Sequence, residues 1–171
     1  MLLLSLKQRK LPGTSEMAAW ENADPPVDRS VIAEVENAWG IKFPEDYVQC
    51  AMVNHGGHPW PNLFFSGEEV FQTLLSFKPP HPWQATNHDR IVDDYAMLAE
   101  QGLLPDKVYP FAYDPAGNYL AFDYRTSPDK PNVVFLLHER MDADDHFTAV
   151  PVSASFTELI DSLTAGNDEE E

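Results

Sequence analysis

The side chains best able to bind a metal ion or to transfer a proton are the six histidines of the chain. Five of them lie beside a glycine pair, in a proline-rich segment or before a glutamate: His55, His58, His81, His88 and His138. Imidazole groups combined with carboxylates form sites for transition metals. The chain contains no His-Glu-x-x-His sequence and no paired cysteine–histidine spacing, however. We therefore interpret the histidines as solvated loop residues and predict no metal site.

Carboxylates are the second group that could do chemistry. The run that contains Asp142, Asp144 and Asp145 begins like a calcium-binding loop. It lacks the central glycine and the distant glutamate of such a loop, so we expect a solvated acidic turn. Three other acids, Asp114, Asp123 and Glu139, could provide a carboxylate pair for acid–base catalysis. Asp114 stands first in a turn, where aspartate is favoured because it hydrogen-bonds to the backbone, and we interpret it as structural.

The single cysteine, Cys50, is the only candidate for a thiol nucleophile. It lies within a helical apolar pattern, which favours a buried structural thiol. One cysteine also excludes an internal disulfide and a thiolate zinc cluster. The chain has no Gly-x-Ser-x-Gly sequence, no phosphate-binding loop and no dinucleotide-binding fingerprint. We therefore predict no catalytic residue, no cofactor and no enzymatic activity.

The charge balance is the strongest compositional signal, because 28 acidic residues face 11 basic ones and give a net charge of −17 over 171 residues. Such a surface repels nucleic acid and anionic membranes and accelerates encounter with basic partners. Hydrophobic residues make up 43% of the chain, which is typical of a folded domain. The first residues carry too short an apolar run, followed by positive charges, for a signal peptide. We expect a cytoplasmic protein without a membrane-spanning segment.

Residues 31–57 form the stretch around which the other elements are organised. Apolar residues recur there at helical spacing, namely Val31, Ile32, Val35 and Trp39. Gly40 follows and ends the helix, because glycine adopts the left-handed conformation without steric cost. Pro44 is suited to the start of a second helix, with Glu45 and Asp46 in its first turn. An Asn-His-Gly-Gly sequence at residues 54–57 ends this second helix.

Downstream, three more helices are predicted, at residues 68–76, 89–101 and 155–163, with a proline-rich loop at 78–88 between the first two. The last helix has Ser155 at its N-cap and Glu158 three residues later, the spacing of a capping box. Strands are predicted where apolar runs of strand length occur, at residues 108–113, 119–124, 133–137 and 147–152. The segment Asp-Pro-Ala-Gly-Asn at 114–118 turns the first of these strands into the second.

The predicted fold class is α+β. A mostly antiparallel sheet of about four to six strands is packed against the N-terminal helices and the C-terminal helix. We expect an N-terminal extension at residues 1–25, a single domain at 26–165 and an acidic tail at 166–171.

The order and spacing of several short motifs resemble the SUKH superfamily, which includes Smi/Knr-type cell-wall regulators and bacterial immunity proteins. In this chain the residues that carry the resemblance are Glu36, Gly40, Phe43, Pro44, Tyr47, Asn54, Gly56, Gly57, Asp114, Gly117, Asn118, Asp123 and Glu139, followed by the helix at 155–163. The resemblance extends over most of the chain and implies the same α+β fold, with these residues in structural roles.

The resemblance also implies a function. Many bacterial members are immunity proteins that bind a toxin, often a basic nuclease, and block it; a regulatory scaffold is the alternative, followed by a metal-dependent enzyme. An acidic surface suits a basic toxin. Tryptophans surrounded by acids are typical of interface anchors. The expected partner contacts are Trp60, Glu68, Glu69, Trp83, Asp93, Asp94, Asp142, Asp144 and Asp145.

Overall fold

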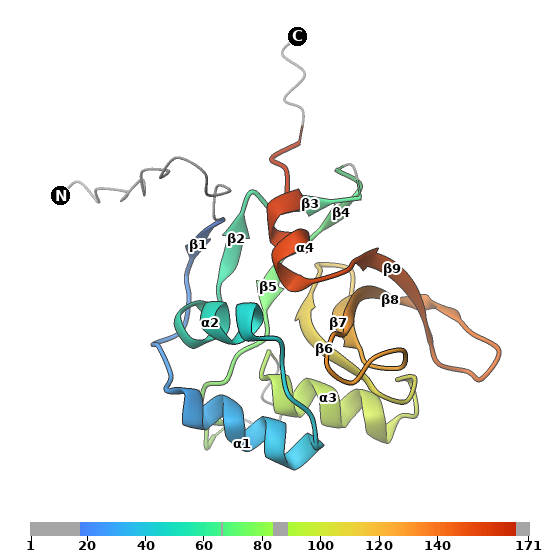
Figure 1. Cartoon of the computed structure of the whole chain (residues 1–171), viewed down its shortest axis with the longest axis horizontal. Helices are drawn as coiled ribbons and strands as arrows, with labels where there is room; N and C mark the ends of the chain where they lie inside the picture. The colour runs from blue at the N-terminus through green and yellow to red at the C-terminus, as the bar shows by residue number, and fades with distance from the viewer. Residues whose placement is uncertain (1–17, 66, 84–88, 167–171) are drawn as a thin grey trace, which may run out of the picture.

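A five-stranded antiparallel sheet forms the centre of the fold, in the order β5–β6–β7–β8–β9 (Figure 1). The computed structural model describes residues 18–65, 67–83 and 89–166. The strands of the sheet are β5 Thr73–Leu74, β6 Val108–Tyr113, β7 Tyr119–Asp123, β8 Asn132–Met141 and β9 Phe147–Ser153. Two short antiparallel pairs lie beside it: β1 Ala19–Glu21 with β2 His58–Trp60, and β3 Leu63–Phe64 with β4 Glu69–Val70.

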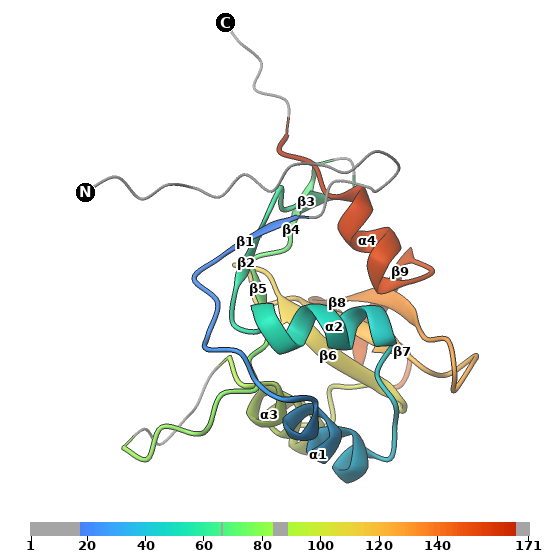
Figure 2. The same cartoon turned by 60° about the vertical axis from the view of Figure 1, so that its left-hand side comes forward.

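In the described part of the chain, four helices accompany the sheet: α1 Arg29–Trp39, α2 Glu45–Asn54, α3 Ile91–Glu100 and α4 Phe156–Ser162. This architecture confirms the predicted α+β class, including the C-terminal helix. Both views show α1 beside α3, while α4 lies at the other end of the molecule (Figures 1 and 2). Most of the N-terminal extension expected at residues 1–25 lies outside the described residues, and so does most of the acidic tail.

The α1–α2 pair forms as its sequence predicts. Ile32 and Val35 are buried on the inner face of α1, and Gly40 ends the helix in the left-handed conformation at φ 69°. α2 follows Pro44 and carries Glu45 and Asp46 in its first turn, where the helix dipole favours negative charge. The hydroxyl of Ser155 accepts a hydrogen bond from the backbone N–H of Glu158 and caps α4.

An aromatic cluster joins α2 and α4 to one face of the sheet. The rings of Phe111 on β6 and Phe122 on β7 stack with centroids 4.3 Å apart. Tyr47 of α2 packs edge-on against Phe122, and Phe156 of α4 packs edge-on against both Tyr47 and Phe111. All four side chains are buried, so the helices are held to the sheet mainly by apolar contact.

The prediction of a helix at residues 68–76 is wrong. This segment forms β4 and then β5, and its backbone bonds to distant residues: the N–H of Phe71 donates to the carbonyl of Asn62, and that of Leu75 to the carbonyl of Phe111. The apolar residues Phe71, Leu74 and Leu75 are fully buried, as expected. Their spacing fits a helix equally well, so periodicity alone could not separate the two structures.

Candidate protein-binding surface

The two tryptophans predicted as anchors both lie at the surface. The side chain of Trp60, at the end of β2, is 54% exposed, and that of Trp83, in the loop before α3, is 88% exposed. Exposure on this scale is unusual for tryptophan and leaves both rings available to a partner. They belong to different parts of the fold: Trp60 lies in β2 and Trp83 in the loop before α3.

The acids around β4 form one candidate patch. Glu68 is exposed, whereas Glu69 is half-buried and pairs in register with Phe64 of β3. Burial raises the pKa of the Glu69 carboxyl, and the negative charges of Asp114 and Glu68 raise it further. The charges of Asp114 and Glu68 therefore both disfavour the ionised form of Glu69. A positively charged side chain from a partner would relieve that repulsion.

The two acids predicted on α3 differ from each other. Asp93 forms an ion pair with Arg90, so much of its charge is already compensated within the chain. Asp94 is only 5% exposed and accepts a hydrogen bond from the hydroxyl of Tyr119, 3.2 Å away. Asp94 is therefore not the surface contact that was predicted. Its position on α3 directs the side chain toward the sheet, so it lies inside the fold.

The acidic turn between β8 and β9 is organised by Asp142. One carboxylate oxygen of Asp142 accepts hydrogen bonds from the backbone N–H groups of Asp144 (2.8 Å) and His146 (3.0 Å). Both hydrogen bonds lower the pKa of the Asp142 carboxyl, and the bond from the N–H of His146 has the larger effect. Asp144 and Asp145 are exposed. Asp142 therefore shapes the turn, and its two neighbours present their charge to solvent.

The same turn contains the one cluster of potential metal ligands among the described residues. Ligand atoms of Asp142, Asp144 and His146 lie within 4.8 Å of one another. Exposed acidic groups often meet in this way without binding an ion, and one oxygen of Asp142 already serves two backbone N–H groups. We assign no metal to this turn.

The interpretation of the histidines as solvated is wrong for His55, which is fully buried. Its Nδ1 accepts the backbone N–H of Phe77 (3.1 Å), so its Nε2 carries the proton and donates to the carbonyl of Pro25 (2.8 Å). Beside it the hydroxyl of Ser76 donates to the carboxylate of Asp24, 2.5 Å away. The ring therefore serves to join three chain segments, and these contacts occupy both of its nitrogens.

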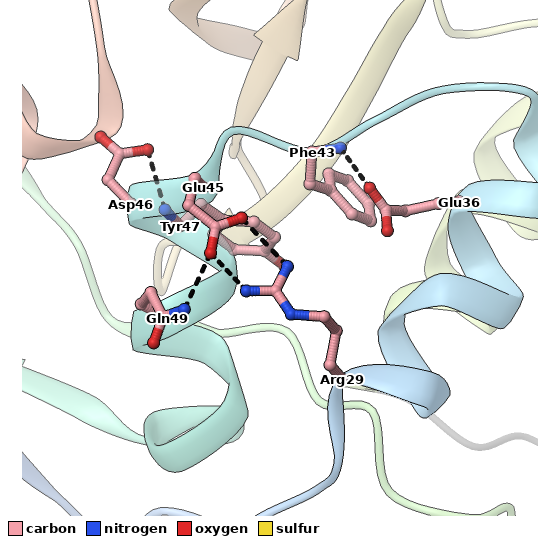
Figure 3. A network of polar contacts seen from close by, with 7 residues as sticks. All are labelled: Arg29, Glu36, Phe43, Glu45, Asp46, Tyr47 and Gln49. Atoms are coloured by element: carbon pink, nitrogen blue, oxygen red, sulfur yellow. Dashed lines mark hydrogen bonds and ion pairs between the residues drawn. The ribbon is translucent and has the colours of Figure 1, made fainter.

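Polar side chains also fix the α1–α2 connection (Figure 3). The guanidinium of Arg29 forms a two-bond ion pair with Glu45, and the side-chain amide of Gln49 donates to the same carboxylate. Glu36 is buried, and its carboxylate accepts the backbone N–H of Phe43 at 2.8 Å. Asp46 accepts the backbone N–H of Tyr47. The figure thus shows side chains from two helices holding the loop between them.

Most of the other motif residues also have structural positions. Asp114 accepts the backbone N–H groups of Ala116 and Asn118, and so closes the turn between β6 and β7. Asp123 pairs with Arg125; burial raises the pKa of this carboxyl, but the hydrogen bonds from Arg125 outweigh burial and lower it overall. Glu139 differs, because its side chain is 88% exposed. Its structural role stays a prediction.

Sequence reasoning missed a cluster of three aromatic rings. Trp39 at the end of α1 and Tyr95 of α3 contact each other and Tyr109 of β6. The helical spacing of Trp39 placed it on the apolar face of its helix, but Trp39 and Tyr95 are both only half-buried. Nothing in the sequence brings residues 39, 95 and 109 together, because their contact depends on how the two helices meet the sheet.

The thiol of Cys50 is less buried than predicted. It is half-buried, and burial raises its pKa to about 11. At neutral pH this thiol carries a proton and is a poor nucleophile. Over the described ranges, no helix combines the length and the apolar character that crossing a lipid bilayer requires.

Comparison with known proteins supports the family named from the sequence motifs. The curated proteins give no match to the chain. Among protein-family models, the SMI1 / KNR4 family (SUKH-1) matches residues 26–162, which include all four helices and the whole central sheet. The chain therefore belongs to the SMI1 / KNR4 family (SUKH-1).

Proposed function

We propose that this protein is a non-enzymatic immunity protein that binds a basic toxin domain, of the nuclease type, and neutralises it in the cytoplasm. The observation that carries the proposal is the excess of 28 acidic over 11 basic residues in a chain of this family. Binding over the nucleic-acid site of a nuclease would place carboxylates where phosphates otherwise lie. Complementary charge of this kind accelerates association and favours one partner over others.

Among the predicted partner contacts, three acids are exposed in a turn or loop: Glu68, Asp144 and Asp145. Trp60 and Trp83 add exposed aromatic area, which anchors many protein interfaces. Asp142 supports the interface indirectly, because its carboxylate holds the turn in which Asp144 and Asp145 lie. Asp93 contributes less, because Arg90 already neutralises it.

The test is an affinity capture of the tagged full chain from lysate of its own source, with elution in steps of rising salt and identification by mass spectrometry. We expect one basic protein in near-equal amount, released late in the gradient, and loss of its toxic activity in the complex. Several weakly held partners would support the regulatory module of the Smi/Knr type instead. A stoichiometric transition metal in the purified protein would support a metal-dependent enzyme.

A charge reversal then tests the turn between β8 and β9. Asp144→Lys should slow association with the captured partner by about tenfold at low salt and leave dissociation nearly unchanged, because an exposed acid acts mainly by steering. Asp145 has φ 61°, so Asp145→Asn is the milder second variant that this backbone accepts. Asp93→Asn serves as the control, since its charge is already paired. An unchanged association rate for Asp144→Lys would remove this turn from the interface.

A further inference from the structure

Three aromatic side chains from three different elements meet at one place on the surface, where α1 and α3 lie side by side (Figure 2). The ring centroids of Trp39 and Tyr95 are 4.4 Å apart, and those of Trp39 and Tyr109 are 5.3 Å apart. Both outer rings lie nearly parallel to Tyr109, with interplanar angles of 19° for Trp39 and 22° for Tyr95. We call these three residues the aromatic trio.

The trio is layered with respect to solvent. Tyr109 is 9% exposed and lies innermost, while Trp39 and Tyr95 are half-buried and form the outer part. Among the described residues, the hydroxyl of Tyr47 is the one buried side-chain polar atom that has no partner. The indole N–H and the tyrosine hydroxyls of the trio are therefore not left buried without a partner. Broad apolar faces with solvated polar edges are typical of binding hot spots.

A carboxylate accompanies the trio. Asp106 is exposed in the connection between α3 and β6, three residues before Tyr109. Burial and then the negative charge of Asp106 raise the pKa of the Tyr95 hydroxyl, and burial, Tyr95 and then Asp106 raise that of Tyr109. The neighbouring residue Lys107 is exposed and carries the opposite charge. The trio thus combines aromatic surface with one exposed carboxylate at its margin.

We propose that Trp39, Tyr95 and Asp106 bind an arginine side chain of the basic protein partner. A guanidinium group is planar, stacks on aromatic faces and pairs with a carboxylate through two parallel hydrogen bonds. The half-buried rings supply the stacking surface, and Asp106 supplies the carboxylate. Lysine fits less well, because a strongly hydrated ammonium gains less from stacking. The assignment rests on the proposed function for its biological partner, but the site itself can be tested without that partner.

The probe is the peptide acetyl-Gly-Arg-Gly-Arg-Gly-amide, titrated into the full chain and followed by NMR of the aromatic side chains. We expect the ring signals of Trp39 and Tyr95 to shift most. The same peptide with lysine should bind about threefold more weakly, and one with neutral citrulline should bind more weakly still. Equal affinity for all three peptides, or shifts spread evenly over the acidic surface, would overturn the proposal.

The same titration, repeated with single-residue variants, tests which side chains bind the arginine peptide. Asp106→Asn and Tyr95→Leu should each weaken binding of the arginine peptide by about threefold, whereas Lys107→Gln should strengthen it by about twofold. The matched control is Glu158→Gln, which removes an exposed acid from α4 at the far end of the molecule (Figure 1). An effect of Glu158→Gln as large as that of Asp106→Asn would show that net charge alone binds the peptide, and would overturn the site.

The two proposals fail separately. If the protein captures a basic partner from lysate but the arginine peptide does not shift the trio, the arginine site is wrong and the proposed function stands. If the peptide binds at the trio with the expected dependence on Asp106 and no basic partner is captured, the site stands and the immunity function is wrong.

Discussion

The α1–α2 pair and the segment that follows it, residues 58–77, are built on different principles. In the helix pair, backbone bonds are local, and the two helices are joined by side chains such as Glu36, which accepts the N–H of Phe43. In the following segment, backbone N–H groups bond to residues far along the chain, as Leu74 does to Gly57 and Leu75 to Phe111 of β6. Local bonding can be inferred from a short stretch of sequence, whereas distant pairing cannot.

The two regions meet at Gly56. Its N–H donates to the carbonyl of Leu74, and its φ of 76° turns the chain from α2 toward β2. Next to it, His55 accepts the N–H of Phe77 and donates to Pro25, and Ser76 donates to Asp24. This junction explains why a histidine and a glycine stand together there: the ring joins the segments, and the missing Cβ lets Asp24 approach.

The largest effect is expected from Gly56→Ala, which attacks this junction. A Cβ at position 56 would lie 2.1 Å from a carboxylate oxygen of Asp24, on a backbone that side chains disfavour. Overpacking and backbone strain together should lower the free energy of unfolding by about 3 kcal/mol, measured by urea denaturation.

The control for that experiment is Gly40→Ala. Gly40 has a similar φ of 69°, but a Cβ there would meet no atom within 4 Å. Only backbone strain remains, so the loss should be about 1 kcal/mol. If both variants lost the same stability, the close contact between Gly56 and Asp24 would not matter, and the two regions would be joined by other contacts.

Removing the hydroxyl group from two different tyrosines should change the free energy of unfolding in opposite directions, by less than Gly56→Ala does. Tyr47 of α2 is fully buried, and its hydroxyl has no hydrogen-bond partner among the described residues. Tyr47→Phe should therefore raise the free energy of unfolding by about 1 kcal/mol. The hydroxyl of Tyr124 donates to the carbonyl of Lys42 at 2.7 Å and ties the α1–α2 loop to the end of β7. Tyr124→Phe should lower the free energy by about 1 kcal/mol.

Urea denaturation of the two single phenylalanine variants and of the double variant measures these changes in the free energy of unfolding. Destabilisation by Tyr47→Phe would mean that its hydroxyl has a partner in solution, such as a buried water, and that α2 depends on polar contacts more than its packing indicates.

Sequence reasoning succeeded where backbone bonds are local and failed where they join distant parts of the chain. Helix ends were found from Gly40, Pro44 and Ser155, because caps and stops act through their immediate neighbours. The helix expected at residues 68–76 was wrong because Phe71, Leu74 and Leu75 suit either structure, and their strand partners lie far along the chain.

The candidate site shows the same limit. The exposure of Trp83 could be anticipated, since it lies in a proline-rich loop and such loops rarely enter a core. The burial of Asp94, by contrast, depends on the direction in which α3 meets the sheet and on the hydroxyl of Tyr119. The contacts within the aromatic trio also depend on how α1 and α3 pack against the sheet. Acidity was visible from composition, but the sequence did not show which carboxylates serve the fold and which face solvent.

The smallest effect is expected at the surface ion pair of the helix region, Arg29 with Glu45. Hydrogen bonds from Arg29 and then Gln49 lower the pKa of Glu45 to about 2, below its ordinary value in an unfolded chain. Stability from this pair is therefore complete above about pH 5 and is lost as the pH falls toward 2. Both side chains are well exposed, so water and salt screen the contribution to folding.

Arg29→Met should return the pKa of Glu45 to its ordinary range of about 4 in a carboxyl NMR titration, whereas Gln49→Ala should shift it less. The urea midpoint at neutral pH should hardly change in either variant, because an exposed pair contributes little net free energy. A pKa that stays low in Arg29→Met would mean that the pair does not form in solution as it does here. A large loss of stability would mean that surface charge, and not the buried bonds of Glu36 and the core around Tyr47, holds the two helices together.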